Sequence, residues 1–418
     1  MSKTFVLHQM GLPDMSTTSL RVLVSGGGIA GNAVALQLLR NGIRTTVVER
    51  ATAPRPGGQA VDLRGPSKEA AERMGLMPGI AKRQLDERGM SYVDGDGKIY
   101  ARMAMEDFDG EGAVAEIEIT RGDLNQVLLD AIDTTDQTLL DYRYGDHITA
   151  LTEDETGVDV TFASGATGRY DLVVGADGVH SATRKLAFGP EDQFATYLGG
   201  YCSYFTMPTP AGVRPGWFEM RSVPGAMLGL RPDRDPATSK AILIVRADHD
   251  PTLRRDVTAQ HNLLNSFLAD AGWRSADILA AMETTPDYYF DELVRIDMPT
   301  LSAGRVTLLG DAGYCGSPMT GMGTAMAIVG AYVLAGEIAS TPTDLTGALK
   351  RYEETLVPFL DKAREIPGGS IKVMLPKSAW MTALARVNMR LMLSAPMRPL
   401  TKKIFFSNST GDFPLPNY

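Results

Sequence analysis

A glycine-rich turn between a short strand and a helix constrains this chain more than any other feature. Leu20–Ser25 is a valine-rich run typical of a buried strand, and Gly26, Gly28 and Gly31 follow it with G-x-G-x-x-G spacing. Helical spacing of apolar residues comes next, and a β-branched run then ends at Glu49. Such a unit binds a dinucleotide, with the pyrophosphate at the helix N-terminus and a ribose on the acidic residue. The pattern alone leaves NAD and FAD both open.

A second strand-to-helix motif favours a flavin. Residues 304–311 read GRVTLLGD, which predicts a strand that delivers Asp311 into a loop, and Pro318, Gly321 and Gly323 precede a long apolar helix. A carboxylate at a strand end suits a ribitol hydroxyl. Bare glycine backbone at a helix start suits the electron-rich edge of a reduced flavin.

Together with the stretch Asp171–Arg184 (DLVVGADGVHSATR), these motifs resemble the class A flavoprotein monooxygenases, the family of para-hydroxybenzoate hydroxylase. Within it, Arg55–Gly65 and Ile117–Leu124 look most similar to tetracycline-inactivating and actinobacterial polyketide-tailoring monooxygenases. The resemblance implies that Asp177 and Arg184 form an ion pair under the flavin, and that Arg55 contacts the nicotinamide cofactor. The expected FAD-contacting residues are Gly26, Gly28, Ile29, Ala30, Gly31, Glu49, Arg50, Asp62, Arg121, Asp177, Asp311, Pro318, Gly321, Met322, Gly323 and Thr324.

The last motif departs from the family's common pattern. Ala325 and Gly330 stand where Asn and Asp are frequent, and Gly313 with Tyr314 stands where Ala-His is common. We therefore expect flavin surroundings that differ from the commonest version in the family.

The predicted fold class is α/β, with a Rossmann-like FAD-binding domain, an inserted β-rich substrate domain and a C-terminal helix. Short aromatic and β-branched runs between residues 200 and 247 predict an antiparallel sheet. The expected divisions are a disordered leader (1–18), a first FAD-binding part (19–190), the substrate domain (191–295), a second FAD-binding part (296–365), and a C-terminal helix and tail (366–418). Five residues of the substrate domain are candidates to line the substrate, although packing in the core is the stronger explanation for each of them: Tyr204, Trp217, Phe218, Met227 and Arg246.

The resemblance implies an FAD-dependent monooxygenase that uses NADPH or NADH and O2. It would hydroxylate a hydrophobic aromatic or polyketide-like molecule through a flavin C4a-hydroperoxide, without a catalytic side chain, in natural-product tailoring or antibiotic inactivation. Baeyer–Villiger oxidation, epoxidation and flavin-dependent dehydrogenation stay open, as does a non-catalytic FAD protein that binds a ligand. A plain NAD dehydrogenase does not explain Asp171–Arg184.

Composition excludes other classes. The 418 residues include 41 Lys and Arg and 50 Asp and Glu, so the net charge is −9. A negative net charge argues against nucleic acid as a binding partner. Two cysteines and five histidines without ligand spacing predict no metal site, and the few cysteines favour a reducing, cytoplasmic compartment. We expect a monomer or homodimer.

Two apolar stretches are long enough to raise the question of whether they span or bind a membrane. The uncharged stretch between Asp311 and Glu337 is glycine-rich, which favours a buried helix over a membrane span. Between Glu365 and Asp412 the chain has basic but no acidic residues, and Trp380, Leu384, Val387 and Leu391 share one helical face. We expect this helix to pack across the two domains with its basic residues solvated; a membrane-surface or partner-binding helix is the alternative. No stable membrane insertion is expected.

Overall fold

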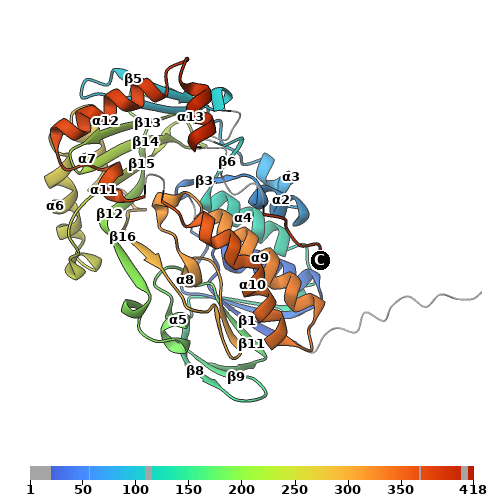
Figure 1. The fold of residues 1–418 in the computed structure, drawn as a ribbon. Helices are drawn as coiled ribbons and strands as arrows, with labels where there is room; N and C mark the ends of the chain where they lie inside the picture. Colours follow the sequence, from blue (N-terminus) through green and yellow to red (C-terminus); the bar gives the residue numbers. More distant parts are fainter. Residues whose placement is uncertain (1–19, 56, 109–114, 367–368, 406–412) are drawn as a thin grey trace, which may run out of the picture.

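The computed structural model describes residues 20–55, 57–108, 115–366, 369–405 and 413–418. The predicted leader at residues 1–18 lies outside this part of the chain. One lobe contains a six-stranded sheet, mostly parallel, as predicted for the dinucleotide-binding part (Figure 1). In spatial order its strands are β17 (Ser302–Ala303), β18 (Val306–Leu308), β11 (Leu172–Gly175), β1 (Arg21–Ser25), β2 (Arg44–Glu49) and β7 (Leu140–Tyr144).

All three glycine-bearing motifs start from this sheet. Strand β1 lies between β2 and β11, parallel to both, and β11 lies parallel to β18. The carboxyl ends of β1, β11 and β18 therefore meet at one edge, where ligands bind in open α/β sheets. Their valine-rich sequences are buried on both faces, as such central strands require.

The second lobe is built on a seven-stranded sheet. In spatial order its strands are β16 (Tyr289–Ile296), β12 (Ala195–Pro208), β15 (Thr238–Val245), β14 (Ala226–Pro232), β13 (Trp217–Val223), β4 (Gly89–Val93) and β5 (Ile99–Ala104). The sheet is antiparallel as predicted, except that β13 and β4 run parallel. Strands β4 and β5 come from the stretch that the sequence assigned to the first FAD-binding part, so this sheet draws on two separate segments.

The two faces of the seven-stranded sheet have different neighbours. One face, with Leu228 and Leu243, packs against α6 (Val257–Leu268) and α7 (Ser275–Met282). Because side chains alternate along a strand, Met227 and Ile242 lie on the opposite face. There they pack with Met319, which comes from the loop before α9. We call this second surface the apolar sheet face.

Smaller elements complete the fold. Two minor sheets are β8 (Ile148–Glu153), β9 (Val158–Phe162) and β10 (Thr167–Tyr170), and β3 (Ala60–Leu63) with β6 (Ile117–Thr120). The remaining helices before the C-terminal region are α1 (Ile29–Arg40), α2 (Pro66–Arg73), α3 (Met77–Ala81), α4 (Arg121–Ile132), α5 (Ala182–Ala187), α8 (Asp311–Tyr314), α9 (Gly323–Ser340) and α10 (Leu345–Ala363).

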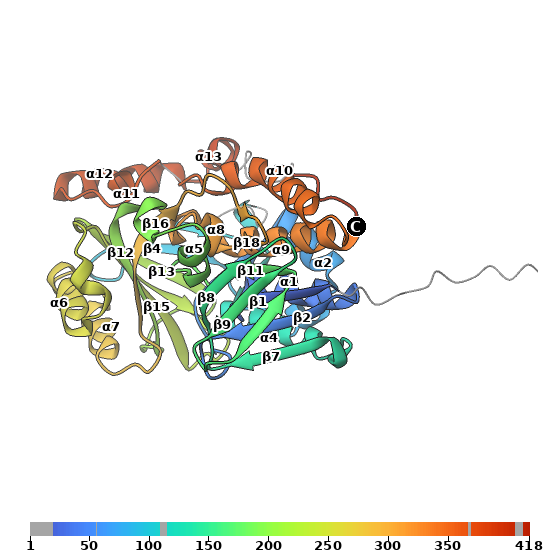
Figure 2. The same cartoon turned by 90° about the horizontal axis from the view of Figure 1, so that it is seen from below.

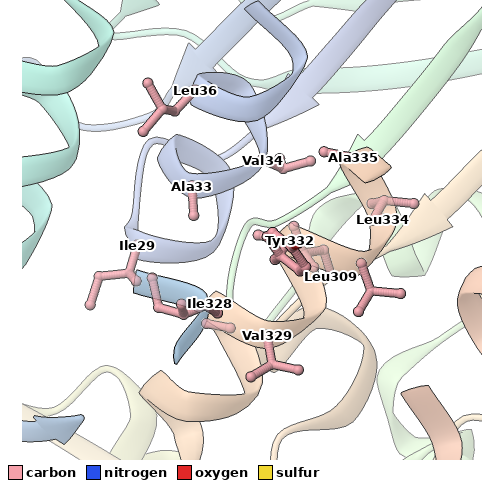
Figure 3. Close-up of a cluster of buried hydrophobic side chains, with 14 of the residues drawn as sticks. Ile29, Ala33, Val34, Leu36, Leu309, Ile328, Val329, Tyr332, Leu334 and Ala335 are labelled. Atoms are coloured by element: carbon pink, nitrogen blue, oxygen red, sulfur yellow. The ribbon is translucent and has the colours of Figure 1, made fainter. Parts of the chain in front are cut away.

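Helix α9 is the centre of the larger core. It packs against α1 and α10, and Figure 3 shows Ile328, Val329 and Tyr332 gathered with Ile29 and Val34 of α1. By length and composition it is the one helix in the described residues that could cross a membrane, but 78% of that window is buried. The expectation of a buried core helix is confirmed.

The C-terminal region forms three further helices, α11 (Ile371–Met374), α12 (Ala379–Met392) and α13 (Arg398–Phe405). Figure 2 shows them along one edge of the molecule, next to α10. The prediction that the face of Trp380, Leu384, Val387 and Leu391 packs onto the protein is wrong, because all four side chains are exposed.

Candidate active site

The three sequence motifs meet in the structure. A Cβ added at Gly26 would lie 2.4 Å from the carbonyl oxygen of Ala176, so the first turn lies against the turn after β11. One added at Gly310 would lie 2.9 Å from Cβ of Ala30, which joins the third motif to the start of α1. The site therefore forms where β1, β11 and β18 end.

Each glycine of the first motif has a distinct structural role. Gly26 has φ +111°, which favours glycine, and a Cβ at Gly31 would lie 1.8 Å from the carbonyl oxygen of Gly26. At Gly28 a Cβ would meet nothing within 4 Å, and this residue is exposed. The turn therefore leaves open backbone at Gly28, where a pyrophosphate can approach.

Two helix N-termini are left without partners from side chains. Neither α1 nor α9 has a side-chain cap or an acidic residue in its first turn. Gly321 precedes α9 in the left-handed conformation, and a Cβ at Gly323 would lie 3.7 Å from Oδ1 of Asp311. The N-terminus of α9 thus lies beside the Asp311 carboxylate, with Pro318 and Gly321 exposed in the preceding loop. Open amides at a helix N-terminus suit phosphates or an anionic ring edge.

The predicted Glu49 and two asparagines that the motifs do not reveal hold the first turn. Glu49 accepts hydrogen bonds from the backbone amides of Gly27 (2.8 Å) and Ala51 (2.7 Å). Asn32 and Asn125 both donate to the carbonyl of Gly27, at 2.8 and 3.2 Å. The carboxylate expected to bind the ribose is therefore oriented by the same turn that would hold the pyrophosphate. Arg50, the next residue, is exposed.

The turn after β11 differs in one contact from the expectation. Asp177 accepts hydrogen bonds from the hydroxyls of Ser181 and Thr183 and, at 3.0 Å, from the Thr183 amide. Arg184 is fully buried and pairs with Glu191 at 3.0 Å. The predicted ion pair between Asp177 and Arg184 is thus replaced by two separate sets of partners, because the start of α5 engages the aspartate.

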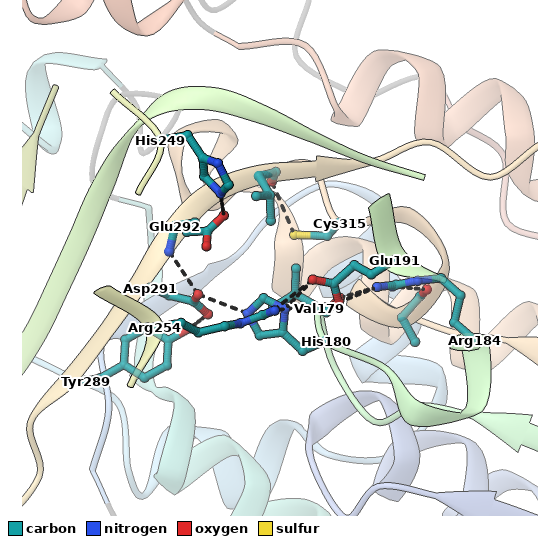
Figure 4. Close-up of polar contacts among 12 residues, drawn as sticks. Val179, His180, Arg184, Glu191, His249, Arg254, Tyr289, Asp291, Glu292 and Cys315 are labelled. Carbon is teal, nitrogen blue, oxygen red and sulfur yellow. Dashed lines mark hydrogen bonds and ion pairs between the residues drawn. The ribbon is translucent and has the colours of Figure 1, made fainter. Parts of the chain in front are cut away.

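His180 links this turn to the second lobe. Its Nε2 lies 3.0 Å from Asp291 and its Nδ1 lies 3.0 Å from Glu191, while Arg254 contacts the ring and also bonds Glu191 (Figure 4). Burial lowers the pKa of His180, but the two carboxylate hydrogen bonds outweigh burial and raise it to about 9. The imidazole is therefore protonated at neutral pH between its two carboxylates.

A ring contact continues this chain onto the apolar sheet face. The hydroxyl of Tyr289 donates to Asp291 at 2.7 Å, and its ring stacks on Tyr204 with centroids 6.0 Å apart. Tyr204 borders the cluster that contains Phe218, Met227 and Met319. Three of the predicted substrate-lining residues, Tyr204, Phe218 and Met227, therefore lie together, facing the loop that precedes α9.

The other two predicted lining residues are placed elsewhere. Trp217 precedes Phe218 on β13 and so points to the opposite face, where Arg102 lies 4.5 Å from its ring centroid. Arg246 donates at 3.4 Å to the carbonyl of Leu375 and so contacts the C-terminal region. Adjacent side chains of a strand point to opposite faces of its sheet, so the prediction that Trp217 and Phe218 line one cavity is wrong.

A buried charge cluster at the junction of the lobes escaped sequence reasoning. Arg231 of β14 pairs with Glu87 at 2.9 Å and with Glu118 of β6 at 2.8 Å, and donates to the carbonyl of Ala60 in β3. Burial raises the pKa of both carboxyls, and Arg231 opposes that rise. Nothing in the local sequence around these three residues marks them as partners, because they lie far apart in the chain.

The loop that precedes α2 contributes further predicted residues. Asp62 of β3 forms an ion pair with Arg64. The backbone amide of Arg121 donates to the carbonyl of Gln59 at 2.9 Å, which places the start of α4 beside this loop. Arg55 is exposed, in the same loop. These residues thus border the junction between the glycine-rich turns and the seven-stranded sheet.

The two departures in the third motif compensate each other. Tyr314 is buried and bonds Tyr352 at 3.4 Å, and its hydroxyl would lie 2.1 Å from a Cβ at Gly330. The larger ring at 314 therefore occupies the space that a side chain at 330 would need. Ala325 is buried in the core of α9.

The residues present fit FAD. The open backbone at Gly28, the uncapped starts of α1 and α9, and the carboxylates of Glu49 and Asp311 supply the groups that phosphates, sugar hydroxyls and an isoalloxazine edge require. Within the described residues no group of three or more His, Cys, Asp or Glu could hold a metal ion.

Comparisons with known proteins agree with this geometry. Residues 19–363 match the family model described as an FAD binding domain. The chain is 38% identical over 358 residues to the uncharacterized protein Rv1260 of Mycobacterium tuberculosis, covering 84% of this chain and 94% of that relative. It is 35% identical over 346 residues to a flavin-dependent monooxygenase of Legionella longbeachae, covering 82% and 86%.

Solved structures give the same answer over almost the whole chain. The crystal structure of the tetracycline destructase Tet(51) superposes with a TM-score of 0.79 at 32% identity, covering 96% of this chain and all of that one. The family model, the relatives and the fold agree with the dinucleotide site and its flavin-suited third motif. The chain therefore belongs to the class A flavin monooxygenases and is an FAD-dependent monooxygenase that uses NAD(P)H and O2.

Proposed function

We propose that this monooxygenase hydroxylates a hydrophobic aromatic or polycyclic small molecule between the loop before α9 and the apolar sheet face. The observation that carries the proposal is that Met319, from that loop, lies in one buried apolar cluster with Phe218 and Met227 of the sheet. The site expected to hold the flavin therefore meets an apolar, aromatic surface. Such a surface binds flat hydrophobic ligands and keeps water from the reacting atoms.

The proposed division of labour follows from the contacts. FAD, reduced by NAD(P)H, supplies the activation of O2. Glu49 and Asp311 would hold hydroxyls of FAD, and the amides at the starts of α1 and α9 would hold its phosphates and ring edge. Asp62, Arg121 and Asp177 border the same site, and Arg55 would meet the nicotinamide cofactor. The apolar sheet face orients the substrate and excludes water, so no side chain has to act as nucleophile.

The substrate class has support from a relative. The tetracycline destructase that superposes on the chain is named for a polycyclic antibiotic. A panel of tetracyclines and planar polycyclic phenols therefore comes first. Baeyer–Villiger oxidation, epoxidation and dehydrogenation would use the same residues, and the products distinguish them.

The test is NADPH oxidation by the purified FAD-loaded enzyme with and without each compound, with O2 uptake and product mass. We expect one compound to accelerate NADPH oxidation and to gain one oxygen atom on an aromatic carbon. A ketone converted to a lactone would show Baeyer–Villiger oxidation, and a product without added oxygen would show dehydrogenation. NADPH oxidation that no compound stimulates would contradict the proposal.

Two neighbouring residues provide matched variants. Met227 lies on the apolar sheet face, whereas Leu228 points to the other face, against α6 and α7. Met227→Ala should raise the KM of the active compound several-fold. Leu228→Ala should lower the stability of the fold, by about 2 to 5 kcal/mol, with little change in KM. Equal effects of both variants on KM would move the substrate away from this face.

A further inference from the structure

The C-terminal helical segment, here α11 to α13 (residues 371–405), presents an apolar stripe to solvent. On α12 the exposed fractions of Trp380, Leu384, Val387 and Leu391 are 68%, 58%, 65% and 57%. Their spacing of four, three and four residues places them on one side of the helix. A contiguous exposed stripe of this kind marks an interaction surface.

The opposite side of α12 is the one that packs on the protein. Arg386 donates to the carbonyl of Ser222 at 3.1 Å, and its guanidinium lies 6.0 Å from the ring centroid of Tyr100. Met389 and Leu393 pack beside Phe108 and the end of β5. The orientation of the helix is therefore set by specific inner contacts, and these contacts direct the apolar stripe outward.

Both ends of the region are anchored. Before α12, Ile371 and Leu375 are buried against the apolar sheet face. After α13, Leu415 is buried, Tyr332 donates to the carbonyl of Pro416 at 3.1 Å, and Tyr418 donates to Glu337 at 2.9 Å. The chain is thus attached to the rest of the enzyme both before and after the C-terminal helical segment, and the stripe is part of the enzyme's surface.

The surroundings of the stripe are basic. Residues 366–411 contain seven Lys and Arg and no Asp or Glu, although the whole chain carries a net charge of −9. Among these residues, Lys372, Lys377 and Arg390 are exposed. Each of the three helices also carries further exposed apolar side chains: Val373, Met374, Met381 and Leu400.

We propose that the C-terminal helical segment docks the enzyme reversibly on an anionic lipid surface. An amphipathic helix with Trp and Leu on one face and Lys and Arg beside it lies in the plane of a membrane interface. The stripe enters the boundary between headgroups and acyl chains, and the basic side chains meet the phosphates. A second copy fits this surface poorly, because the exposed Lys372, Lys377 and Arg390 would face the same three positive charges. The expectation of no stable membrane insertion is compatible with such docking.

The test uses the full chain with FAD bound. Flotation with vesicles of phosphatidylcholine and phosphatidylglycerol, and with vesicles of phosphatidylcholine alone, measures binding, and tryptophan emission reports the transfer of Trp380. We expect binding to the anionic vesicles with a blue shift, weakened by added salt, and little binding to the neutral ones. Equal binding to both kinds of vesicle, or binding to neither, overturns the proposal.

Matched variants separate the apolar and the charged contributions. Leu384→Asp with Val387→Asp should reduce binding on the order of 100-fold, because both side chains are exposed in the free enzyme and lie in the lipid when it is docked. Lys377→Gln with Arg390→Gln should weaken it about 25-fold, since each basic residue near an anionic surface contributes about fivefold. Neither pair should change NADPH oxidation in solution.

The controls are equally exposed residues on other surfaces. Val257→Asp on α6, and Lys82→Gln with Lys350→Gln, should leave vesicle binding within about twofold of the wild type. A control that weakens binding as much as the test pairs overturns the proposal. So does a dimer, seen by light scattering, that the Leu384 and Val387 pair dissolves while vesicles are not bound, because the stripe then covers a second copy.

Discussion

The two sides of the active site are built by different means. On the FAD side, the site is formed mainly by backbone. Gly26 and Gly31 let neighbouring backbone segments pack closely, and Gly28 leaves amides open. All three glycines lie within a stretch of six residues. On the sheet side, the surface is made by side chains such as Phe218, Met227 and Met319, which come from separate strands and a distant loop. A site can thus combine one half encoded locally with another half that exists only after the chain has folded.

The junction between these halves is where substitutions should cost most. Arg231 is surrounded by Glu87 and Glu118, whose side chains are 0% and 2% exposed. Arg231→Met would leave both carboxylates buried without their cation. We expect a loss of about 3 to 5 kcal/mol in the free energy of unfolding, measured in urea.

A nearby arginine is the control for this prediction. Arg234 pairs with Asp123 across the same junction, but its side chain is 57% exposed. Arg234→Met should cost less than about 1 kcal/mol. Adding Glu87→Gln to Arg231→Met should restore part of the loss. If the Arg231 and Arg234 variants have equal stabilities, charge burial does not hold the two halves together.

The next prediction concerns a place where the FAD side depends on a distant side chain. Gly330→Ala would put a Cβ 2.1 Å from the Tyr314 hydroxyl, and both residues are buried. We expect a loss of about 1 to 3 kcal/mol in the free energy of unfolding from overpacking.

Removal of the Tyr314 hydroxyl provides the control. In a Tyr314→Phe background the nearest ring carbon would lie 3.3 Å from the new Cβ, so Gly330→Ala should cost much less. Alanine is also the better helix former by about 0.5 to 1 kcal/mol. Additive effects of the two substitutions would show that Tyr314 and Gly330 do not compensate each other.

The two halves also differ in what the sequence reveals. The first strand is found within one residue of Leu20–Ser25, the second strand ends at Glu49 as predicted, and a helix lies between them. A glycine-rich turn between a valine run and a helix is a local signal. The runs of the substrate sheet are found as strands as well. The pairing of these strands is not predicted. Strands β4 and β5 join the sheet through a parallel contact between β4 and β13, and no local sequence pattern indicates this contact.

The sequence does not reveal on which side of a sheet or helix a side chain lies, or which distant residue it contacts. Trp217 and Phe218 are adjacent and equally aromatic, yet only Phe218 lies on the apolar sheet face. For α12, helical spacing marks the apolar stripe, but the same spacing fits a stripe facing inward or outward. The stripe faces outward because the opposite side of α12 is held to the sheet by Arg386, which donates to the carbonyl of Ser222, 164 residues away. Contacts of this range depend on the finished sheet and cannot be inferred from periodicity.

The smallest expected effect tests whether the open backbone on the FAD side is reserved for ligand. Gly28 has φ −82°, which alanine adopts without strain, and an added Cβ would meet no protein atom within 4 Å. Gly28→Ala should therefore keep the thermal stability of the FAD-free protein. It should also weaken FAD binding by about tenfold or more, because the methyl group occupies the path of the pyrophosphate. Fluorescence titration with FAD measures the affinity.

Gly31→Ala is the contrasting variant, because its Cβ would lie 1.8 Å from the carbonyl oxygen of Gly26. It should lower the stability of the FAD-free protein itself, since the helix can no longer lie close to the strand. If Gly28→Ala bound FAD as tightly as the wild type, the exposed glycine would not face the cofactor. If it instead destabilised the free protein as much as Gly31→Ala, the whole turn would serve packing. Only loss of affinity with retained stability separates a glycine kept for the ligand from one kept for the fold.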